Sequence, residues 1–369
     1  MRLFLEILSW LFVILLGLLT FSMILLGNWP QAALLFAATL LLMPPVAHLL
    51  QHTLGWPLSG WSRALASIVL VGLAMFLLTR ERPTSIYLTP EAEATHLALY
   101  DERLSQWPVP YESVYVDTEY GPVHVIISGP EDGPAMLLLN ASGMSGSSWV
   151  TNVGALNRVY RTYAIDTIGE AGKSRLTDIA HYPADGEAWA VLIGEIADEL
   201  GVARAAVIGA SYGGYIATNY ARFAPERVER LALLGPMGLT PSTGSTVARI
   251  VFAQFFPIKP IQDRTLHWAI GDDPRLLAET ESWFRTLMTG MYPQVSQPVT
   301  FSPAELAQVS APTLLILGSQ DYLTRDPDAV MDLASNVPDI EFKVLETGHM
   351  IGMEAPEEVN ELLMAFFED

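Results

Sequence analysis

The sequence predicts an α/β domain with a mostly parallel eight-stranded sheet and a helical cap insertion, preceded by transmembrane helices. Two observations support this prediction. From residue 111 to the carboxyl terminus, short β-rich runs alternate with helix-like stretches, which is the pattern of a doubly wound sheet. The first 80 residues are mostly apolar and carry only four formal charges, at Arg2, Glu6, Arg63 and Arg80.

Residues 1–80 are expected to form a membrane region with about three transmembrane helices. The run at residues 7–26 is uncharged and long enough to cross a bilayer core of about 30 Å at about 1.5 Å per helical residue. Residues 32–50, which two prolines interrupt, are a second candidate, and residues 64–79 are a shorter third one. Two spans are the alternative, and a cleaved signal peptide is an alternative reading of the first run. The lipid bilayer is therefore a predicted partner.

Charge and cysteine content exclude several classes of function. Residues 81–369 carry 17 basic against 39 acidic residues, so this part repels phosphate backbones and anionic lipid headgroups. A nucleic-acid partner is therefore not expected. The absence of cysteine removes disulfide bonds, zinc–thiolate sites and thiol nucleophiles from consideration. With the amino terminus inside, three spans place the acidic domain outside the cytoplasm, which is the expected localisation.

The region after residue 80 divides into a connector and a folded domain. Residues 81–110 are polar and punctuated by proline, and they are expected to form a juxtamembrane connector. Helices are expected at residues 186–200, 212–223 and 356–367. Strands are expected at residues 111–117, 123–128, 135–140, 162–166, 205–209, 230–234, 312–318 and 341–345. Several are continuous apolar runs, typical of central parallel strands, and the Tyr120-Gly121 turn joins the first two as an antiparallel edge hairpin.

One long insertion interrupts the alternation of strands and helices. About 75 residues separate the strand that ends at Leu234 from the strand that begins at Pro312, more than one crossover needs. We therefore expect a cap or lid over about residues 237–305. Its Phe, Met and Trp residues either line a site for a hydrophobic substrate or simply pack onto the core, and the sequence does not separate these alternatives.

The stretch Gly209-Ala210-Ser211-Tyr212-Gly213 follows an apolar strand directly and opens a helix. This is the context that the Gly-x-Ser-x-Gly nucleophile elbow requires. A side chain at Gly209 or Gly213 would collide with neighbouring backbone in so tight a turn. The pattern predicts Ser211 as a nucleophile, whereas the alternative is an ordinary glycine-rich turn.

A serine hydroxyl is a poor nucleophile at neutral pH, so Ser211 needs an imidazole base that a carboxylate orients. Only His267 and His349 follow Ser211, and His349 lies in the loop after the last strand, where the sheet's carboxyl edge would present it. Asp321 follows the end of the preceding strand, so it is expected at the same carboxyl edge of the sheet. Asp326 and Asp328 are competitors in the same loop, which could instead cap the helix that follows.

With these motifs, residues 111–369 resemble the α/β-hydrolase superfamily. The resemblance implies a Ser211, Asp321 and His349 triad and assigns the loop that begins Asn140-Ala141 to the oxyanion hole. Many members of the superfamily begin this loop with His-Gly, so its geometry is an open point here. Backbone N–H groups carry this function, and those of Ser142 and Tyr212 are the expected donors, with a one-residue uncertainty for the first.

The segment from Asp166 to Ser174 ends in Gly-Lys-Ser, which raises the question of a nucleotide site. A phosphate-binding loop needs glycine where this chain has Thr167, so the motif fails and no nucleotide is expected. The segment instead resembles the Asp-x-x-Gly-x-x-Gly-x-Ser loop of the same superfamily. Asp166 is expected to tie the amides of this loop together.

These features predict a membrane-anchored serine hydrolase that cleaves hydrophobic acyl esters through an acyl-enzyme on Ser211, with no metal or cofactor. Amidase, thioesterase and peptidase activities use the same triad and stay open as alternatives. A membrane-anchored binding module that has lost turnover is a further alternative, which only Asn140-Ala141 favours. A transporter is disfavoured, because the apolar runs contain no carboxylate between residues 7 and 79.

Overall fold

The structure is a computed structural model that describes residues 10, 12–21, 29–43, 46, 60–79, 85–178, 181–240, 259–271, 273–291, 298–324 and 326–368. The chain divides into two compact units, Met1–Arg82 and Pro83–Asp369. The boundary falls where the apolar amino-terminal region gives way to the acidic remainder.

The first unit is helical. Residues 12–21, α2 (Trp29–Leu42) and α4 (Gly60–Thr79) are helices, and α2 packs against α4. Leu16, Leu35 and Ala38 form a small buried cluster. The Ser67 hydroxyl donates a hydrogen bond of 3.2 Å to the Ala38 carbonyl and joins the two helices.

The predicted transmembrane helices are not supported by the described part of the chain. Within the ranges given above, no helix combines the length and the apolar character needed to cross a bilayer. The run at residues 7–26 is described only at residue 10 and over residues 12–21. The run at residues 32–50 contains the end of α2, whose 14 residues extend about 21 Å, short of a hydrocarbon core of about 30 Å. The run at residues 64–79 lies in α4, where the side chains of residues 74–79 are outside the described part.

The second unit is built on an eight-stranded sheet, as the sequence predicts. The strand order is β1-β2-β4-β3-β5-β6-β7-β8, antiparallel across β1, β2 and β4 and parallel from β4 to β8. The strands are β1 (Tyr111–Thr118), β2 (Gly121–Ser128), β3 (Ala135–Leu139), β4 (Arg161–Ile165), β5 (Ala205–Ala210), β6 (Val228–Leu234), β7 (Thr313–Gly318) and β8 (Ile340–Leu345). The central strands are buried along their length, which explains their continuous apolar runs.

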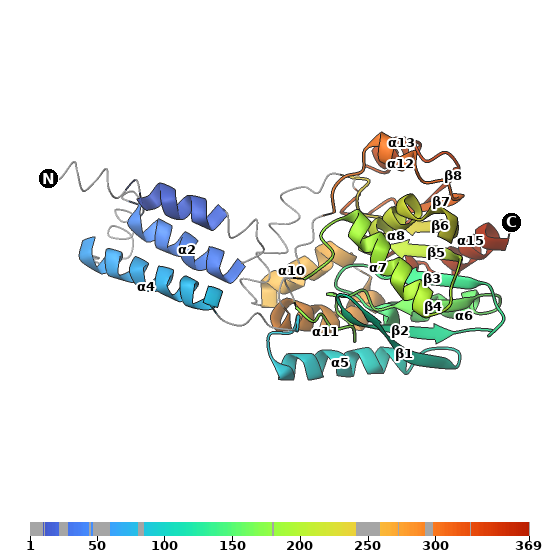
Figure 1. Cartoon of the computed structure of the whole chain (residues 1–369), viewed down its shortest axis with the longest axis horizontal. Helices are drawn as coiled ribbons and strands as arrows, with labels where there is room; N and C mark the ends of the chain where they lie inside the picture. The colour runs from blue at the N-terminus through green and yellow to red at the C-terminus, as the bar shows by residue number, and fades with distance from the viewer. Residues whose placement is uncertain are drawn as a thin grey trace. The chain divides into compact units, whose positions relative to one another are not determined.

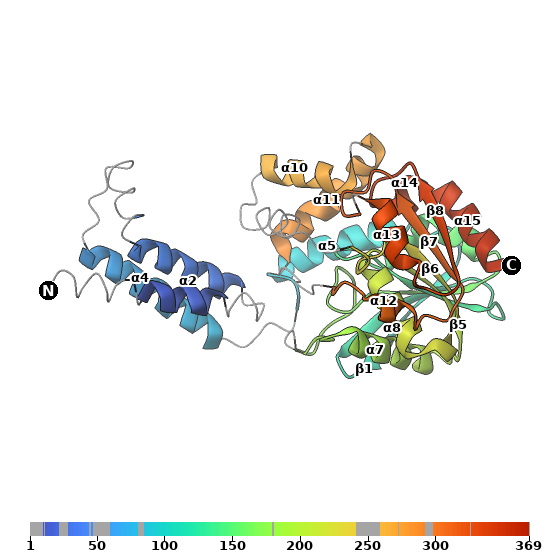
Figure 2. The ribbon, with the colours of Figure 1, turned by 90° about the horizontal axis from the view of Figure 1, so that it is seen from above.

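Helices cover both faces of the sheet. The helices α7 and α8 pack together on one face, and α15 lies on the other (Figure 2). On that face α15 packs against α6. The bounds of these helices are α6 (Val153–Leu156), α7 (Gly186–Glu199), α8 (Tyr212–Phe223) and α15 (Pro356–Glu368). Short helices complete the unit, namely η1 (Gly146–Thr151), η2 (Pro225–Arg227), α12 (Pro303–Leu306), α13 (Pro327–Ala334) and α14 (Ile351–Glu354).

Three further helices lie together at one end of the sheet (Figure 1). They are α5 (Pro90–Leu104), from the segment predicted as a connector, and α10 (Lys259–Ile270) and α11 (Pro274–Gly290), from the insertion between β6 and β7. The helix α11 packs against both α5 and α10. A backbone bridge between Tyr87 and Met291 ties the segment before α5 to the end of the insertion. Residues 241–258 and 292–297 of the insertion are outside the described part.

Candidate active site

Ser211 lies at the turn between β5 and α8, and its backbone conformation is unusual among the described residues. Its φ of 49° and ψ of −111° make it the one residue other than glycine with positive φ among those described. Such a conformation costs an L-residue about 1–3 kcal/mol, so the surrounding structure must hold it. The Ser211 N–H does so in part, because it donates a hydrogen bond of 2.9 Å to the Leu234 carbonyl of β6.

The two glycines of the motif allow this turn to exist. A Cβ at Gly209 would collide with the Gly213 carbonyl, and a Cβ at Gly213 would collide with the Leu139 carbonyl at the end of β3. Both clashes are with backbone atoms, so the backbone would have to move to admit a side chain. The nucleophile elbow predicted from the sequence is therefore a requirement of close backbone packing at this point.

The structure brings the three predicted triad residues together from three loops at the carboxyl edge of the sheet. His349 Nε2 lies 2.8 Å from the Ser211 hydroxyl, and His349 Nδ1 lies 2.9 Å from Asp321 Oδ2. All three side chains are buried, with residues between 3% and 8% exposed. In this arrangement Nδ1–H donates to the carboxylate and leaves Nε2 to accept the serine proton.

Asp321 is held as a carboxylate. Burial by itself would raise the pKa of this carboxyl, but the interactions with His349 and the hydrogen bonds from Leu323 and Thr324 together outweigh burial and lower the pKa below its ordinary value. The N–H of Leu323 at 2.7 Å and the hydroxyl of Thr324 at 2.9 Å also donate to it. Of its competitors, Asp326 caps α13 by accepting from the Ala329 N–H, as a helix cap should.

A small cavity adjoins Ser211 and His349. Its volume is about 40 Å³. Its wall is mostly apolar, which suits an uncharged acyl or alcohol group better than an ionic one. The lining residues are Ala141, Met144, Ser148, Trp149, Asn152, Ala210, Ser211, Leu234, His349, Met350, Ile351, Gly352 and Met353.

The Asn140 side chain, in the position where many related proteins have histidine, organises the loop assigned to the oxyanion hole. Its Nδ2 donates to the carbonyls of Ala141 and Met144, both at 2.9 Å, and its Oδ1 accepts from the N–H and hydroxyl of Thr167. Asn140 thus closes the loop on itself and fastens it to the loop after β4. Of the predicted oxyanion residues, Tyr212 begins α8 next to Ser211, whereas Ser142 is exposed and its neighbour Ala141 lines the cavity.

The loop after β4 contributes a second contact, which the sequence analysis missed. Glu170 is 4% exposed and accepts hydrogen bonds from the Gly143 N–H at 2.6 Å and the Ser142 hydroxyl at 3.1 Å. One signal was available, because β3 and β4 are neighbours and their following loops must meet at the same edge of the sheet. An acidic residue in the second loop was therefore a candidate partner for the first.

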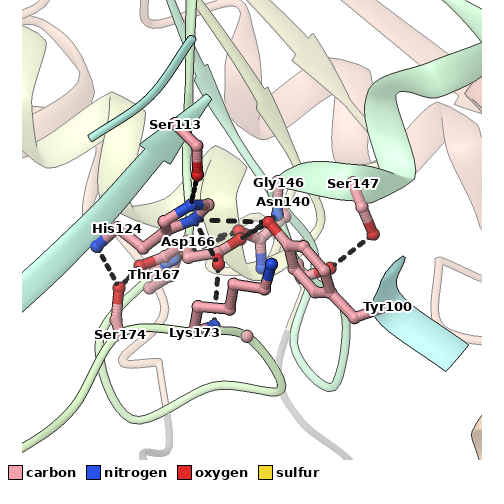
Figure 3. A network of polar contacts seen from close by, with 12 residues as sticks. Tyr100, Ser113, His124, Asn140, Gly146, Ser147, Asp166, Thr167, Lys173 and Ser174 are labelled. Carbon is pink, nitrogen blue, oxygen red and sulfur yellow. Dashed lines mark hydrogen bonds and ion pairs between the residues drawn. The ribbon is translucent and has the colours of Figure 1, made fainter. Parts of the chain in front are cut away.

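Asp166 at the end of β4 is the centre of a separate buried network (Figure 3). Its carboxylate accepts from the N–H groups of Gly146 at 2.7 Å and Lys173 at 2.8 Å, and from His124 Nδ1 at 3.0 Å. The prediction that Asp166 ties the amides of its own loop is confirmed for Lys173, and Asp166 also ties this loop to Gly146 after β3. The Lys173 N–H of the Gly-Lys-Ser segment is thus already bonded to a carboxylate, and Lys173 Nζ pairs with Asp101 at 2.7 Å.

Comparison with known proteins identifies the family. A model of the alpha/beta hydrolase family matches residues 136–362, which is more than half of the chain. An uncharacterised carboxylesterase of Bacillus subtilis, nap, is 32% identical over 292 residues, covering 73% of this chain and 90% of the relative. Carboxylesterase YbfK of the same organism is 30% identical over 286 residues, covering 72% and 91%. The crystal structure of naproxen esterase from Bacillus subtilis matches with a TM-score of 0.69 at 31% identity, covering 76% of this chain and 99% of that one.

The chain therefore belongs to the α/β hydrolase family. It is a carboxylesterase-like serine hydrolase. The sequence-based predictions of the α/β hydrolase fold and of the class of enzyme are confirmed, whereas the predicted transmembrane helices are not supported by the described residues. The roles of the individual site residues stay predictions, which the geometry above makes specific.

Proposed function

We propose that this protein cleaves carboxylic esters with a hydrophobic acyl or alcohol part through an acyl-enzyme on Ser211. The observation that carries the proposal is the hydrogen-bonded chain from Ser211 through His349 to Asp321 at the edge of an apolar cavity. Ser211 attacks the ester carbonyl while His349 Nε2 takes its proton and then passes that proton to the leaving alcohol. His349 next takes a proton from water, which attacks the acyl-enzyme and releases the acid.

Support for an uncharged, hydrophobic substrate comes from the wall of the cavity and from the names of the relatives. Leu234, Met350 and Ile351 line the cavity together with Ala141 and Met144, and none of these side chains offers a charge to a substrate. The three relatives compared above are named as esterases. An ester is therefore preferred over an amide, thioester or peptide, for which the same triad would serve.

We also propose that the first unit attaches the enzyme to a membrane, with the hydrolase unit outside the cytoplasm. The near absence of charge in residues 1–80 supports this, as does the exposure of Phe12, Leu18 and Ile68, which are 50%, 63% and 68% exposed. Full-length protein expressed in cells should stay with the membrane fraction in alkaline carbonate. Release into the supernatant would contradict attachment, and protection of the hydrolase unit from external protease would contradict its placement.

The direct test of the esterase proposal is labelling with a fluorophosphonate probe, combined with hydrolysis of p-nitrophenyl esters of increasing acyl length. Wild type should label and should cleave esters with a preference for longer chains. Ser211→Ala and His349→Ala should do neither while keeping the circular dichroism spectrum of the wild type. A folded wild type that neither labels nor hydrolyses would instead support the binding-module alternative.

A further inference from the structure

A buried carboxylate lies beneath the loop assigned to the oxyanion hole, outside the triad. Glu170 is 4% exposed, and its Oε2 accepts from the Gly143 N–H at 2.6 Å. The Ser142 hydroxyl lies 3.1 Å from Oε1 and 3.3 Å from Oε2. Both donors belong to the same two-residue stretch of the loop, so the carboxylate acts on one point of its backbone.

Burying a carboxylate is unfavourable unless donors compensate it. Burial raises the pKa of Glu170 to about 7, although the hydrogen bonds from Gly143 and Ser142 act in the opposite direction. The ionisable group shown to act on it is Tyr182, whose hydroxyl lies 3.5 Å from that of Tyr212. Burial raises the pKa of Tyr182 well above its ordinary value, and among the described residues no cation acts on the Glu170 carboxyl.

The hydrogen bonds to Glu170 determine which backbone N–H groups of the loop stay available to bind an oxyanion. The Gly143 N–H is committed to Glu170, and the Met144 N–H donates to the Ala141 carbonyl at 3.1 Å. Over residues 141–144, the N–H groups of Ala141 and Ser142 have no acceptor among the described residues. The sequence named Ser142 as the first oxyanion donor with an uncertainty of one residue, and both positions lie within that range.

The cap helix holds the same point of the loop from its other side. Trp283 Nε1 of α11 donates to the Gly143 carbonyl at 2.7 Å, and Leu287 of α11 occupies the space that a Cβ on Gly143 would need. Gly143 has a φ of 71°, a conformation that glycine adopts without strain. The two peptide units that flank Gly143 are thus held, one by Glu170 through the N–H and the other by α11 through the carbonyl.

We propose that Glu170 is a positioning residue for the oxyanion hole. By taking the Gly143 N–H and the Ser142 hydroxyl, it holds residues 140–144 in the conformation that turns the free N–H groups of Ala141 and Ser142 toward the carbonyl attacked by Ser211. The inference deepens the proposed esterase function and rests on it. It assigns to Glu170 no proton transfer and no contact with substrate.

Glu170→Gln is the sharpest variant, because it keeps the shape of the side chain and replaces one acceptor with an NH₂ donor. That donor can face the Ser142 hydroxyl, which then accepts instead of donating, so the Gly143 N–H keeps an acceptor but loses a charged one. An interaction made only in the transition state lowers kcat and kcat/KM together. We expect both to fall by about tenfold, because a hydrogen bond to a charged acceptor is about twice as strong as one to a neutral acceptor and holds the loop more firmly, with KM within about threefold of the wild type.

The experiment compares wild type, Glu170→Gln, Glu170→Asp and the exposed control Glu187→Gln in the full-length protein, normalised by end-point titration with a fluorophosphonate. A peptidic or alkyl boronic acid, which mimics the tetrahedral intermediate, should lose affinity in Glu170→Gln by the same factor as kcat/KM. Glu170→Asp should recover part of the loss, because it restores the carboxylate. Glu187→Gln should match the wild type.

The pH profile supplies a readout that a merely structural role would not move. The ionised carboxylate accepts both hydrogen bonds, so protonation of Glu170 should lower activity in addition to protonation of the His349 base. As the pH falls, kcat/KM should therefore decrease with a dependence on two protons in the wild type and on one proton in Glu170→Gln. Equal boronate affinity in wild type and Glu170→Gln, or a change confined to KM, would overturn the inference. If Glu170→Gln does not fold, the same comparison with Glu170→Asp decides. A wild type that does not hydrolyse esters would overturn the esterase proposal, and this inference with it.

Discussion

The hydrolase unit contains two chains of hydrogen bonds with the same chemical order. In one, Ser211 and Asp321 lie 2.8 Å and 2.9 Å from the two ring nitrogens of His349. In the other, Ser113 and Asp166 lie 2.5 Å and 3.0 Å from the two ring nitrogens of His124. Judged by side-chain distances alone, either arrangement is a Ser-His-Asp relay.

The two serines differ in their exposure, in their backbone conformation and in the presence of an adjoining cavity. Ser211 is 6% exposed, lies at a strained turn before α8 and borders a cavity. Ser113 is exposed on β1, an edge strand, with a regular antiparallel register to β2. Asp166 also accepts from the N–H groups of Gly146 and Lys173, so its carboxylate fixes loops as well as a histidine (Figure 3).

The difference shows that a hydrogen-bonded Ser-His-Asp chain provides a general base but is not sufficient for catalysis. Acyl transfer also needs a pocket for the substrate and preorganised donors for the oxyanion, which supply a large part of the rate enhancement. Around Ser211 the carboxyl ends of the parallel strands bring these elements together. Around Ser113 the described residues form a regular antiparallel hairpin at the edge of the sheet, which leaves the serine exposed.

The largest effect should separate the two serines. Ser211→Ala should lower kcat/KM for esters by about 10⁴-fold or more, because the nucleophile is lost, whereas Ser113→Ala should stay within twofold of the wild type. Steady-state hydrolysis of the best p-nitrophenyl ester measures both. A loss above tenfold in Ser113→Ala, at unchanged active-site titre, would mean that the second relay takes part in turnover.

The second prediction concerns the structural role of Asp166. Asp166→Asn should lower the free energy of unfolding by about 3 kcal/mol, because an amide cannot accept from Gly146, Lys173 and His124 at once and leaves buried donors unpaired. Urea denaturation of the full-length protein measures the change, with the exposed Asp132→Asn as matched control. Equal stability of the two variants would contradict the assignment.

The third prediction concerns a buried histidine without a carboxylate partner. His96 is fully buried, and its Nε2 lies 3.3 Å from the Ala171 carbonyl. Its ring contacts that of Trp283 at a tilt of 56°, with the ring centroids 4.0 Å apart. Burial lowers its pKa from 6.5 to about 4, and the charges of Arg103 and Arg175 act in the same direction.

The lowered pKa of His96 sets the direction of a pH effect. The unfolded chain binds the proton near pH 6.5 and the folded protein does not, so stability is complete above that pH and falls between pH 6.5 and pH 4. At pH 5 the loss should be about 2 kcal/mol relative to pH 7.5. His96→Gln should lack this part of the acid loss in urea denaturation at the two pH values. An unchanged pH dependence would show that His96 is protonated in the folded state.

The smallest effect should come from removing the Ser113 hydroxyl. Ser113→Ala should cost about 1 kcal/mol of stability, because it removes one hydrogen bond at an exposed position where water can replace the hydroxyl. The same urea titration used for Asp166→Asn measures it. A cost equal to that of Asp166→Asn would mean that the serine is as essential to the network as the carboxylate.

The sequence was sufficient for the features that depend on local pattern. Continuous apolar runs placed the central strands, and the Gly209–Gly213 motif placed Ser211, because a strained elbow tolerates only glycine at its close contacts. Chain order then placed Asp321 and His349 in the loops after the last two strands. The apolar run at residues 32–50 was interpreted as a span, but α2 ends at Leu42.

Only the tertiary structure brought together residues that no motif connects. His124 and Asp166 lie 42 residues apart, and Glu170 reaches Gly143 across 27 residues, because neighbouring strands align their loops at one edge of the sheet. A pattern along the chain records which residues repeat with the period of a helix or a strand. Which side chains meet across the sheet depends on strand order and register. The sequence therefore determined the fold class, the candidate triad and the expected role of Asp166, whereas packing decided that His124 joins Asp166 and that Glu170 holds the loop after β3.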